Sequence, residues 1–245
     1  NICPPLPANH LPSDNESDGI QQLIEIRKYK RYIRNNWPEN KWRLHRWAYH
    51  RLTEMVDKKI GIVLDALKQS GLEEDTIIVF TSDHGDMDSA HGLEHKTVFY
   101  EESTRIPFIF KYKRVCKEAF VDDDHLVCNG LDLFPTLCDL ADVKAPHHVL
   151  GKSLKPILQG KTDIPWRTYV VIENQVGFMI TDGWHKYSID DVGENREMLF
   201  DLEKDPGEMK NCAGLAAYKD IQQKLQHELV KNLEYRGVTL KTPIA

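Results

Sequence analysis

The sequence has no apolar run that approaches the roughly 20 residues a membrane-spanning helix needs. It also has no initiator Met and no basic segment followed by an apolar one, so we do not expect its start to be a signal peptide. We therefore expect an internal piece of a longer chain. The net charge of -6 gives no general attraction to nucleic acid or to an anionic membrane. We expect neither as a partner, and an anionic substrate would have to be held by local groups.

Cysteine is also scarce: the five residues are odd in number, widely spaced and form no CxxC pair. This pattern argues against a zinc site or a disulfide framework and favours buried free thiols, although it leaves room for one disulfide. The composition, 41% hydrophobic and 29% charged, is typical of a globular protein and argues against disorder. A chain of 245 residues is long enough for one large domain with a small appendage.

The most informative segment is IIVFTSDHGD at residues 77–86, where a short β-branched and apolar run stops on polar residues. This pattern is typical of the carboxyl end of a buried parallel strand, and open α/β sheets bind their ligands at such ends. Asp83 and His84 can both coordinate a cation, but the pair alone does not choose between a hard and a borderline ion. Two ligands are also too few, and Asp83 as a turn cap is an equally plausible interpretation.

A second group of polar residues follows in the long loop 82–104, which contains His91, His95 and Lys96. An ammonium beside imidazoles near a metal is suited to holding a tetrahedral oxyanion, and a histidine could protonate a leaving group. The alternative is a solvated loop whose charged side chains face water. Long ordered loops of this composition are usually functional.

The remaining pattern predicts an α/β protein with two parts. A long helix over 41–69 leads into a strand at 76–81, and a further strand follows at 106–110. Short β-branched segments separated by turns at 168–173, 177–181, 184–189 and 197–201 predict an antiparallel meander, closed by an amphipathic helix over 215–233. We expect residues 1–160 to belong to a large α/β domain and 161–245 to form a small α+β subdomain.

Several motifs follow one another along the chain. The segment from Ser82 to Pro107 carries S-D-H-G, then H-G, then a Lys, then Y-E-x-S-x-R-I-P. LDLFPTL at 131–137, GKSL at 151–154 and LFDLEKDPGE at 199–208 come after it. In this order the motifs resemble those of the formylglycine-dependent sulfatases of the alkaline phosphatase superfamily, with Phe200 in place of the usual Tyr.

The resemblance implies a fold and a set of roles. The fold would be part of an alkaline-phosphatase-like mixed sheet with flanking helices, plus the small antiparallel subdomain. Asp83 and His84 would be two ligands of a divalent cation, usually Ca²⁺ in this family. Lys96 would bind the sulfate oxygens, and His91 would lie near the leaving group. His95 has no clear family role.

The family's nucleophile is missing from this chain, because none of the five cysteines lies in a C-x-[PA]-x-R motif. The resemblance therefore implies the C-terminal half of a sulfatase. The formylglycine and the remaining acidic ligands would lie on an N-terminal half, which we expect as a partner. The isolated chain would be inactive.

The expected activity is hydrolysis of a sulfate ester on a small molecule or glycan. Two alternatives remain at this stage: a phosphodiesterase or phosphonate monoester hydrolase of the same superfamily, or a non-catalytic domain that binds sulfated glycan. The resemblance is compatible with a periplasmic, secreted or lysosomal protein.

Overall fold

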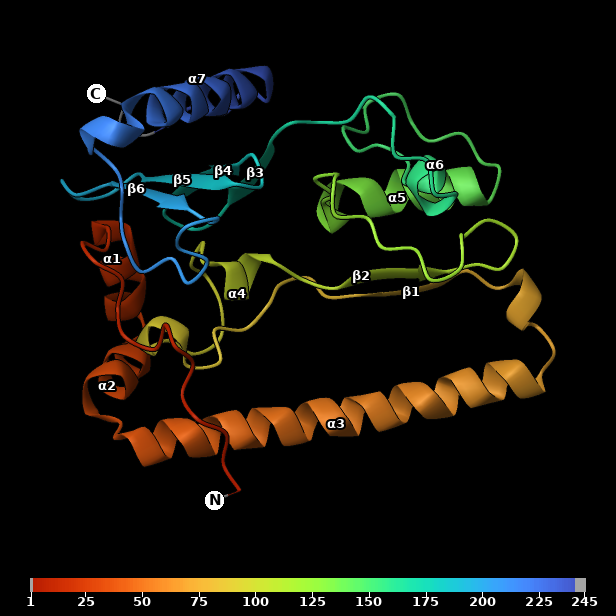
Figure 1. The fold of residues 1–245 in the computed structure, drawn as a ribbon, viewed down its shortest axis with the longest axis horizontal. Helices are drawn as coiled ribbons and strands as arrows, with labels where there is room; N and C mark the ends of the chain where they lie inside the picture. The colour runs from red at the N-terminus through yellow and green to blue at the C-terminus, as the bar shows by residue number, and fades with distance from the viewer. Residues whose placement is uncertain (1, 241–245) are drawn as a thin grey trace. The chain divides into compact units, whose positions relative to one another are not determined.

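A computed structural model describes residues 2–240 (Figure 1). Its helices are α1 (Asp18–Ile26), α2 (Lys28–Asn36), α3 (Glu39–Gln69), α4 (Glu101–Thr104), α5 (Asn129–Leu140), α6 (Lys155–Leu158) and α7 (Lys219–Tyr235). Short 3-10 turns are η1 (Glu73–Asp75), η2 (Ala90–Gly92) and η3 (Ala216–Tyr218). The strands are β1 (Ile78–Thr81), β2 (Phe108–Lys111), β3 (Val170–Glu173), β4 (Gly177–Thr181), β5 (His185–Asp190) and β6 (Glu197–Asp201).

The chain divides into two compact units. The first contains residues Asn1–Tyr49, His84–Arg105 and Tyr169–Ala245, and the second His50–Asp83 and Ile106–Thr168. The boundary expected at residue 160 concerns the domains of the whole fold and stays a prediction. None of the helices within residues 2–240 combines the length and the apolar character needed to cross a bilayer. All five cysteines are free thiols, of which only Cys212 is buried.

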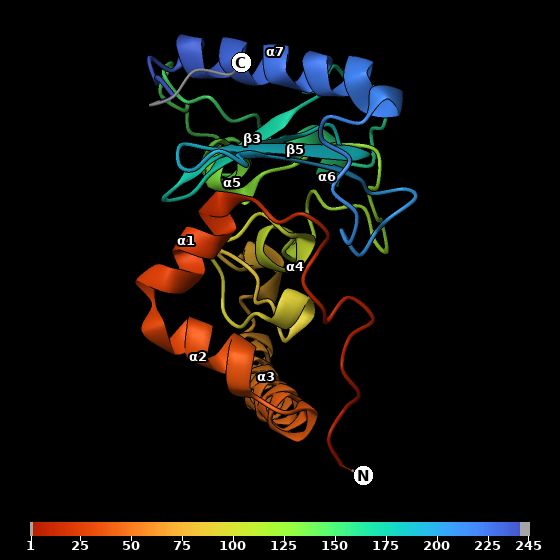
Figure 2. The same ribbon diagram turned by 90° about the vertical axis from the view of Figure 1, so that its left-hand side faces the viewer.

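The first unit is built on the antiparallel sheet β3-β4-β5-β6, which confirms the predicted meander and its closing helix. Helix α7 covers one face of this sheet (Figures 1 and 2). Strand side chains that point to α7 are apolar and meet a row of leucines from the helix. This cluster comprises Phe178, Ile180, Tyr187, Ile189, Leu199, Leu225, Leu229 and Leu233. The two-residue period of the strands and the helical spacing of the leucines therefore produce one continuous core.

The opposite face of the same sheet is covered by α1 and by segment 84–105, which carries η2 and α4 (Figure 2). Apolar residues from the helix, the segment and the sheet meet there, including Leu23 of α1, Leu93 of the segment and Phe200 of β6. Strand β5 nevertheless presents Lys186, Ser188 and Asp190 on this face, all buried. Buried polar groups require partners, so this face is where the segment is held by specific bonds.

In the second unit, β1 and β2 pair antiparallel, with Phe80 opposite Ile109. The expectation of a buried parallel strand at 76–81 is therefore wrong within the described residues. The exposed fractions of Phe80 and Ile109 are 43% and 57%. An apolar β-branched run indicates a strand but does not specify its neighbour or the direction of pairing.

The motifs at 131–137 and 151–154 meet in a buried polar centre at the first turn of α5. The carboxylate of Asp132 accepts hydrogen bonds from the backbone N–H of Cys128 at 2.8 Å and of Lys152 at 2.9 Å. It also pairs with the guanidinium of Arg167 through both oxygens. A Cβ at Gly151 would lie 1.7 Å from the Leu131 carbonyl oxygen, so only glycine allows this approach.

Helix α3 confirms the long helix expected over 41–69, but most apolar side chains beyond its first turn are exposed. Trp42 near its start is 2% exposed. Further along the helix, Leu52, Met55, Val56, Ile62 and Val63 are each exposed by at least 57%. Scattered exposed apolar residues are ordinary, but a helix that carries this many has the character of an interaction surface.

We predict that replacing Leu229 by Ala, which leaves a cavity between α7 and the sheet, will lower the free energy of unfolding by about 2–5 kcal/mol. Leu229 is 0% exposed. Tyr235 on the same helix is 77% exposed, and Tyr235→Ala is the matched control. Denaturant unfolding of both variants measures the difference. Equal small losses would contradict the assignment of this face as the core.

Candidate functional site

Segment 84–105 carries most of the predicted site residues on an unusually constrained backbone. Five residues other than glycine adopt positive φ angles within ten positions: Asp88, Ser89, His91, His95 and Thr97. Such conformations cost about 1–3 kcal/mol each and persist only where the surroundings impose them. Clustering of this kind is typical of functional loops.

Buried cations and amides hold the segment in place. Lys30 of α2 donates from its Nζ to the Lys96 carbonyl oxygen at 3.0 Å and to that of Glu94 at 3.4 Å. Burial lowers the pKa of Lys30. Asn174, just after β3, donates to the carbonyl oxygen of Thr97 at 2.9 Å. Neither Lys30 nor Asn174 belongs to a motif that the sequence singled out.

The structure brings His84 and Lys96 together. The ammonium of Lys96 contacts Nε2 of His84, and the other ring nitrogen, Nδ1, lies 2.7 Å from the Gly85 carbonyl oxygen. A carbonyl can only accept, so Nδ1 carries the proton and Nε2 presents its lone pair. A fixed tautomer of this kind is what a metal-ligating histidine uses.

Asp83 follows β1 and is exposed, with the Ser82 hydroxyl 3.4 Å from its Oδ1. The backbone just before it is fixed, because the amide of Asn129 donates to the Ser82 carbonyl oxygen at 2.7 Å. A carboxylate and an imidazole fit a divalent cation chemically, yet Ca²⁺ takes six to eight oxygen ligands. Within residues 2–240 no group of three or more His, Cys, Asp or Glu side chains is placed to hold a metal ion. The described residues can therefore supply only part of a metal site.

His91 lies apart from this pair, in the core. Its ring is 0% exposed and stacks on Tyr100 with a centroid distance of 3.6 Å and an angle of 7°. The side-chain amide of Asn9 is 3.4 Å from its Nε2, while its Nδ1 has no hydrogen-bond partner among the described residues. Burial, with Arg34 and Lys186 nearby, lowers the pKa of His91 to about 3. The ring is thus neutral at physiological pH.

The other polar residues of the loop make local contacts. His95 is exposed and lies 3.0 Å from a carboxylate oxygen of Glu94 and 3.7 Å from one of Asp86. Arg105 is 4.0 Å from Glu101 in an exposed ion pair. Such exposed pairs contribute little to stability.

Comparison with known proteins identifies relatives of this arrangement. The Sulfatase family model matches residues 10–143. A Delta 4,5-hexuronate-2-O-sulfatase of Bacteroides thetaiotaomicron is 36% identical over 195 residues, which is 76% of this chain and 40% of the relative.

Solved structures give the same picture. A structure described as a 2-O GAG sulfatase superposes with a TM-score of 0.87 at 32% identity, over 99% of this chain and 56% of that one. The phosphonate monoester hydrolase of Agrobacterium radiobacter superposes with a TM-score of 0.71 at 26% identity, over 80% of this chain and 42% of that one. The chain thus spans about half the length of the proteins it matches.

We predict that His91→Phe, which keeps the stack on Tyr100, will remove the contribution of this ring to the change of unfolding free energy between pH 7 and pH 5, measured as the difference between variant and wild type. Because the folded-state pKa is about 3 and the unfolded value 6.5, protonation favours unfolding as pH falls below 6.5. Between pH 7 and pH 5 the wild type should lose about 2 kcal/mol through this group. Denaturant unfolding at both pH values measures it. His95→Asn, at an exposed position, should keep the wild-type dependence. An unchanged dependence in His91→Phe would refute the buried neutral ring.

Proposed function

The chain belongs to the sulfatase family, and we propose that it forms the part of a sulfuric ester hydrolase that carries half of the metal and sulfate site. The observation that carries this proposal is the contact between Lys96 and the lone pair of His84 on a backbone fixed by Lys30 and Asn174. A candidate cation ligand, His84, and a candidate anion-binding ammonium, Lys96, are adjacent there, and transfer of a sulfate group would use both.

Asp83 and His84 are the proposed ligands of a divalent cation, with Ca²⁺ the first candidate from the family. When bound, the cation would stabilise the negative charge of the sulfate group. The hydrogen bond from His84 Nδ1 to Gly85 keeps Nε2 available as a donor of its lone pair. The remaining ligands and the formylglycine nucleophile would come from residues outside this chain.

Lys96 is the proposed sulfate-binding residue. Its ammonium has three N–H donors and no acceptor, which suits the oxygens of a tetrahedral anion. The cation beside His84 would compete for the lone pair that Lys96 contacts here, so Lys96 would be released to donate to the substrate. The role expected for His91 near the leaving group stays a prediction, because its ring is buried in the described chain.

A sulfated glycan is the proposed substrate class. The relatives named above act, by their descriptions, on a hexuronate 2-O-sulfate and on a 2-O-sulfated GAG. A 2-O-sulfated uronic acid is therefore the first substrate to try. A phosphonate monoester hydrolase is the second candidate, because one shares the fold at a lower TM-score and identity. A non-catalytic sulfated-glycan-binding domain would keep the same anion-binding residues.

The partner that we propose is the remainder of the sulfatase fold. The exposed apolar side chains of α3 and the open hairpin β1–β2 are surfaces that such a remainder would cover. The 2-O GAG sulfatase structure matches 99% of this chain but extends well beyond it.

We predict that Lys96→Met in the complete protein will lower kcat for an aryl sulfate by about 100-fold or more, the usual loss when one charge-stabilising donor is removed. Lys161 is an exposed lysine elsewhere in the chain, and Lys161→Met is the matched control. Full activity in Lys96→Met would exclude Lys96 from sulfate binding. A wild-type protein without turnover would contradict the proposed function itself.

Residues 1–245 produced alone should show no sulfate-ester turnover and should self-associate in size-exclusion chromatography, because the apolar side chains of α3 face water. Addition of the remaining sulfatase residues as a separate chain should restore a single discrete complex. A well-behaved, active monomer of 1–245 would contradict the need for a partner.

A further inference from the structure

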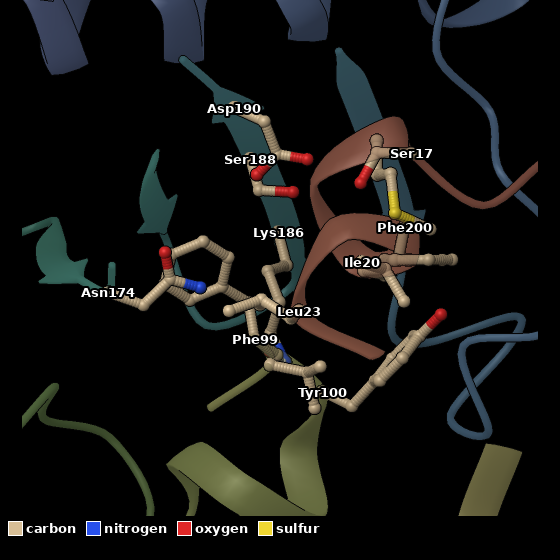
Figure 3. Close-up of a pocket in the computed structure, with 12 residues that line it drawn as sticks. Ser17, Ile20, Leu23, Phe99, Tyr100, Asn174, Lys186, Ser188, Asp190 and Phe200 are labelled. Atoms are coloured by element: carbon tan, nitrogen blue, oxygen red, sulfur yellow. Dashed lines mark hydrogen bonds between the residues drawn. The ribbon is translucent and has the colours of Figure 1, made fainter. Parts of the chain in front are cut away.

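Lys186 is a buried cation that connects the C-terminal sheet to segment 84–105. It lies on β5 and is 2% exposed. Its Nζ lies 2.7 Å from Glu101 Oε1, 2.7 Å from Glu208 Oε1 and 2.9 Å from the carbonyl oxygen of Phe99. Figure 3 shows the side chain running from the strand toward Phe99 and Tyr100. All three partners of one ammonium are therefore on, or bonded to, the segment.

Glu208 completes a closed ring of contacts. Its side chain is 1% exposed, and its second oxygen, Oε2, accepts the backbone N–H of Glu101 at 2.6 Å. Glu101 is the first residue of α4, so the carboxylate of Glu208 lies at the N-terminal end of this short helix, where the backbone N–H groups favour negative charge. Burial raises the pKa of Glu208 to about 7, and the charge of Lys186 opposes that shift. The ammonium thus favours the ionised form of Glu208.

The contacts continue from α4 to the proposed metal ligand. The backbone N–H of Gly85 donates to the carbonyl oxygen of Ser103, the third residue of α4, at 2.8 Å. A Cβ at Gly85 would lie 1.9 Å from the Glu102 carbonyl oxygen, so the two backbones touch directly. The side-chain amide of Asn9 donates to Glu102 Oε1 at 2.7 Å, which adds a second bond to α4. Gly85 is bonded to α4 on one side and adjoins His84 on the other.

We propose that Lys186 and Glu208 are positioning residues, which set the place of α4 and through it the orientation of His84 toward Lys96. The expected effect on metal binding and turnover rests on the proposed function. The expected effect on the position of α4 and Gly85 does not. Neither residue touches the reacting groups. Their effect passes through Glu101, Ser103 and Gly85.

A purely structural role can be separated from positioning by removing both charges. Loss of Lys186 alone would leave Glu208 buried without a counter-charge, which destabilises strongly. Replacement of a buried ion pair by two apolar residues is often neutral for stability. Lys186→Met combined with Glu208→Leu should therefore stay folded while α4 loses both bonds that hold its first residue.

The experiment compares wild type, the double variant and Lys231→Met in the complete protein. Lys231 is an exposed lysine of the same subdomain whose carboxylate partner, Glu228, is not buried, and it serves as the control. Calcium chloride titrated into metal-free protein gives Kd, an aryl sulfate gives kcat and KM, and hydrogen exchange reports on the Gly85 amide. Melting temperatures confirm that each variant is folded.

We expect the double variant to bind Ca²⁺ about 10- to 100-fold more weakly, as for other residues that orient a ligand. Its kcat should fall, and Gly85 should exchange faster at temperatures well below melting. Unchanged Kd, kcat and exchange in a folded double variant would overturn the inference. If the wild type neither binds Ca²⁺ nor hydrolyses sulfate, the proposed function fails, and the exchange of Gly85 still decides whether Lys186 and Glu208 hold the segment.

Discussion

The first unit depends on one buried charge cluster, in which the ammonium of Lys186 lies between Glu101 and Glu208. A lysine with 2% exposure is costly unless its charge is compensated. Here part of the compensation, the carboxylate of Glu101, comes from a segment that lacks extended regular structure of its own. Segment 84–105 contains only η2 and α4, so its conformation must be imposed by the neighbouring sheet and helices.

The two faces of the antiparallel sheet contribute to the structure in different ways. The face under α7 is apolar and supplies stability through leucine packing. The face under α1 and segment 84–105 combines apolar contacts with buried Lys186, Ser188 and Asp190. Hydrogen bonds and ion pairs of such buried polar groups are directional. They therefore fix the position of the segment on the sheet, whereas apolar contacts alone would allow it to shift. These bonds also hold the positive φ angles of the segment, which the chain would not adopt without them.

Much of the fold was predictable from local patterns, because the meander, α3 and α7 follow from the two-residue and 3.6-residue periods. The pairing of β1 was not, since a strand's apolar run carries no information on its neighbour. His84 and Lys96 were recognisable by their order along the chain. Lys30 and Lys186 were not, because a lysine in a helix or strand normally indicates a solvated face, and only the tertiary structure shows its burial.

The central claim is that the anion held by Lys96, beside a cation at Asp83 and His84, is the sulfate of an ester. The most direct test measures kcat/KM of the complete protein on paired aryl sulfate, aryl phosphate and phosphonate monoesters that share one leaving group. Our account predicts the highest value for the sulfate ester. A preference for the phosphonate or phosphate ester would contradict it, and so would the absence of turnover on all three.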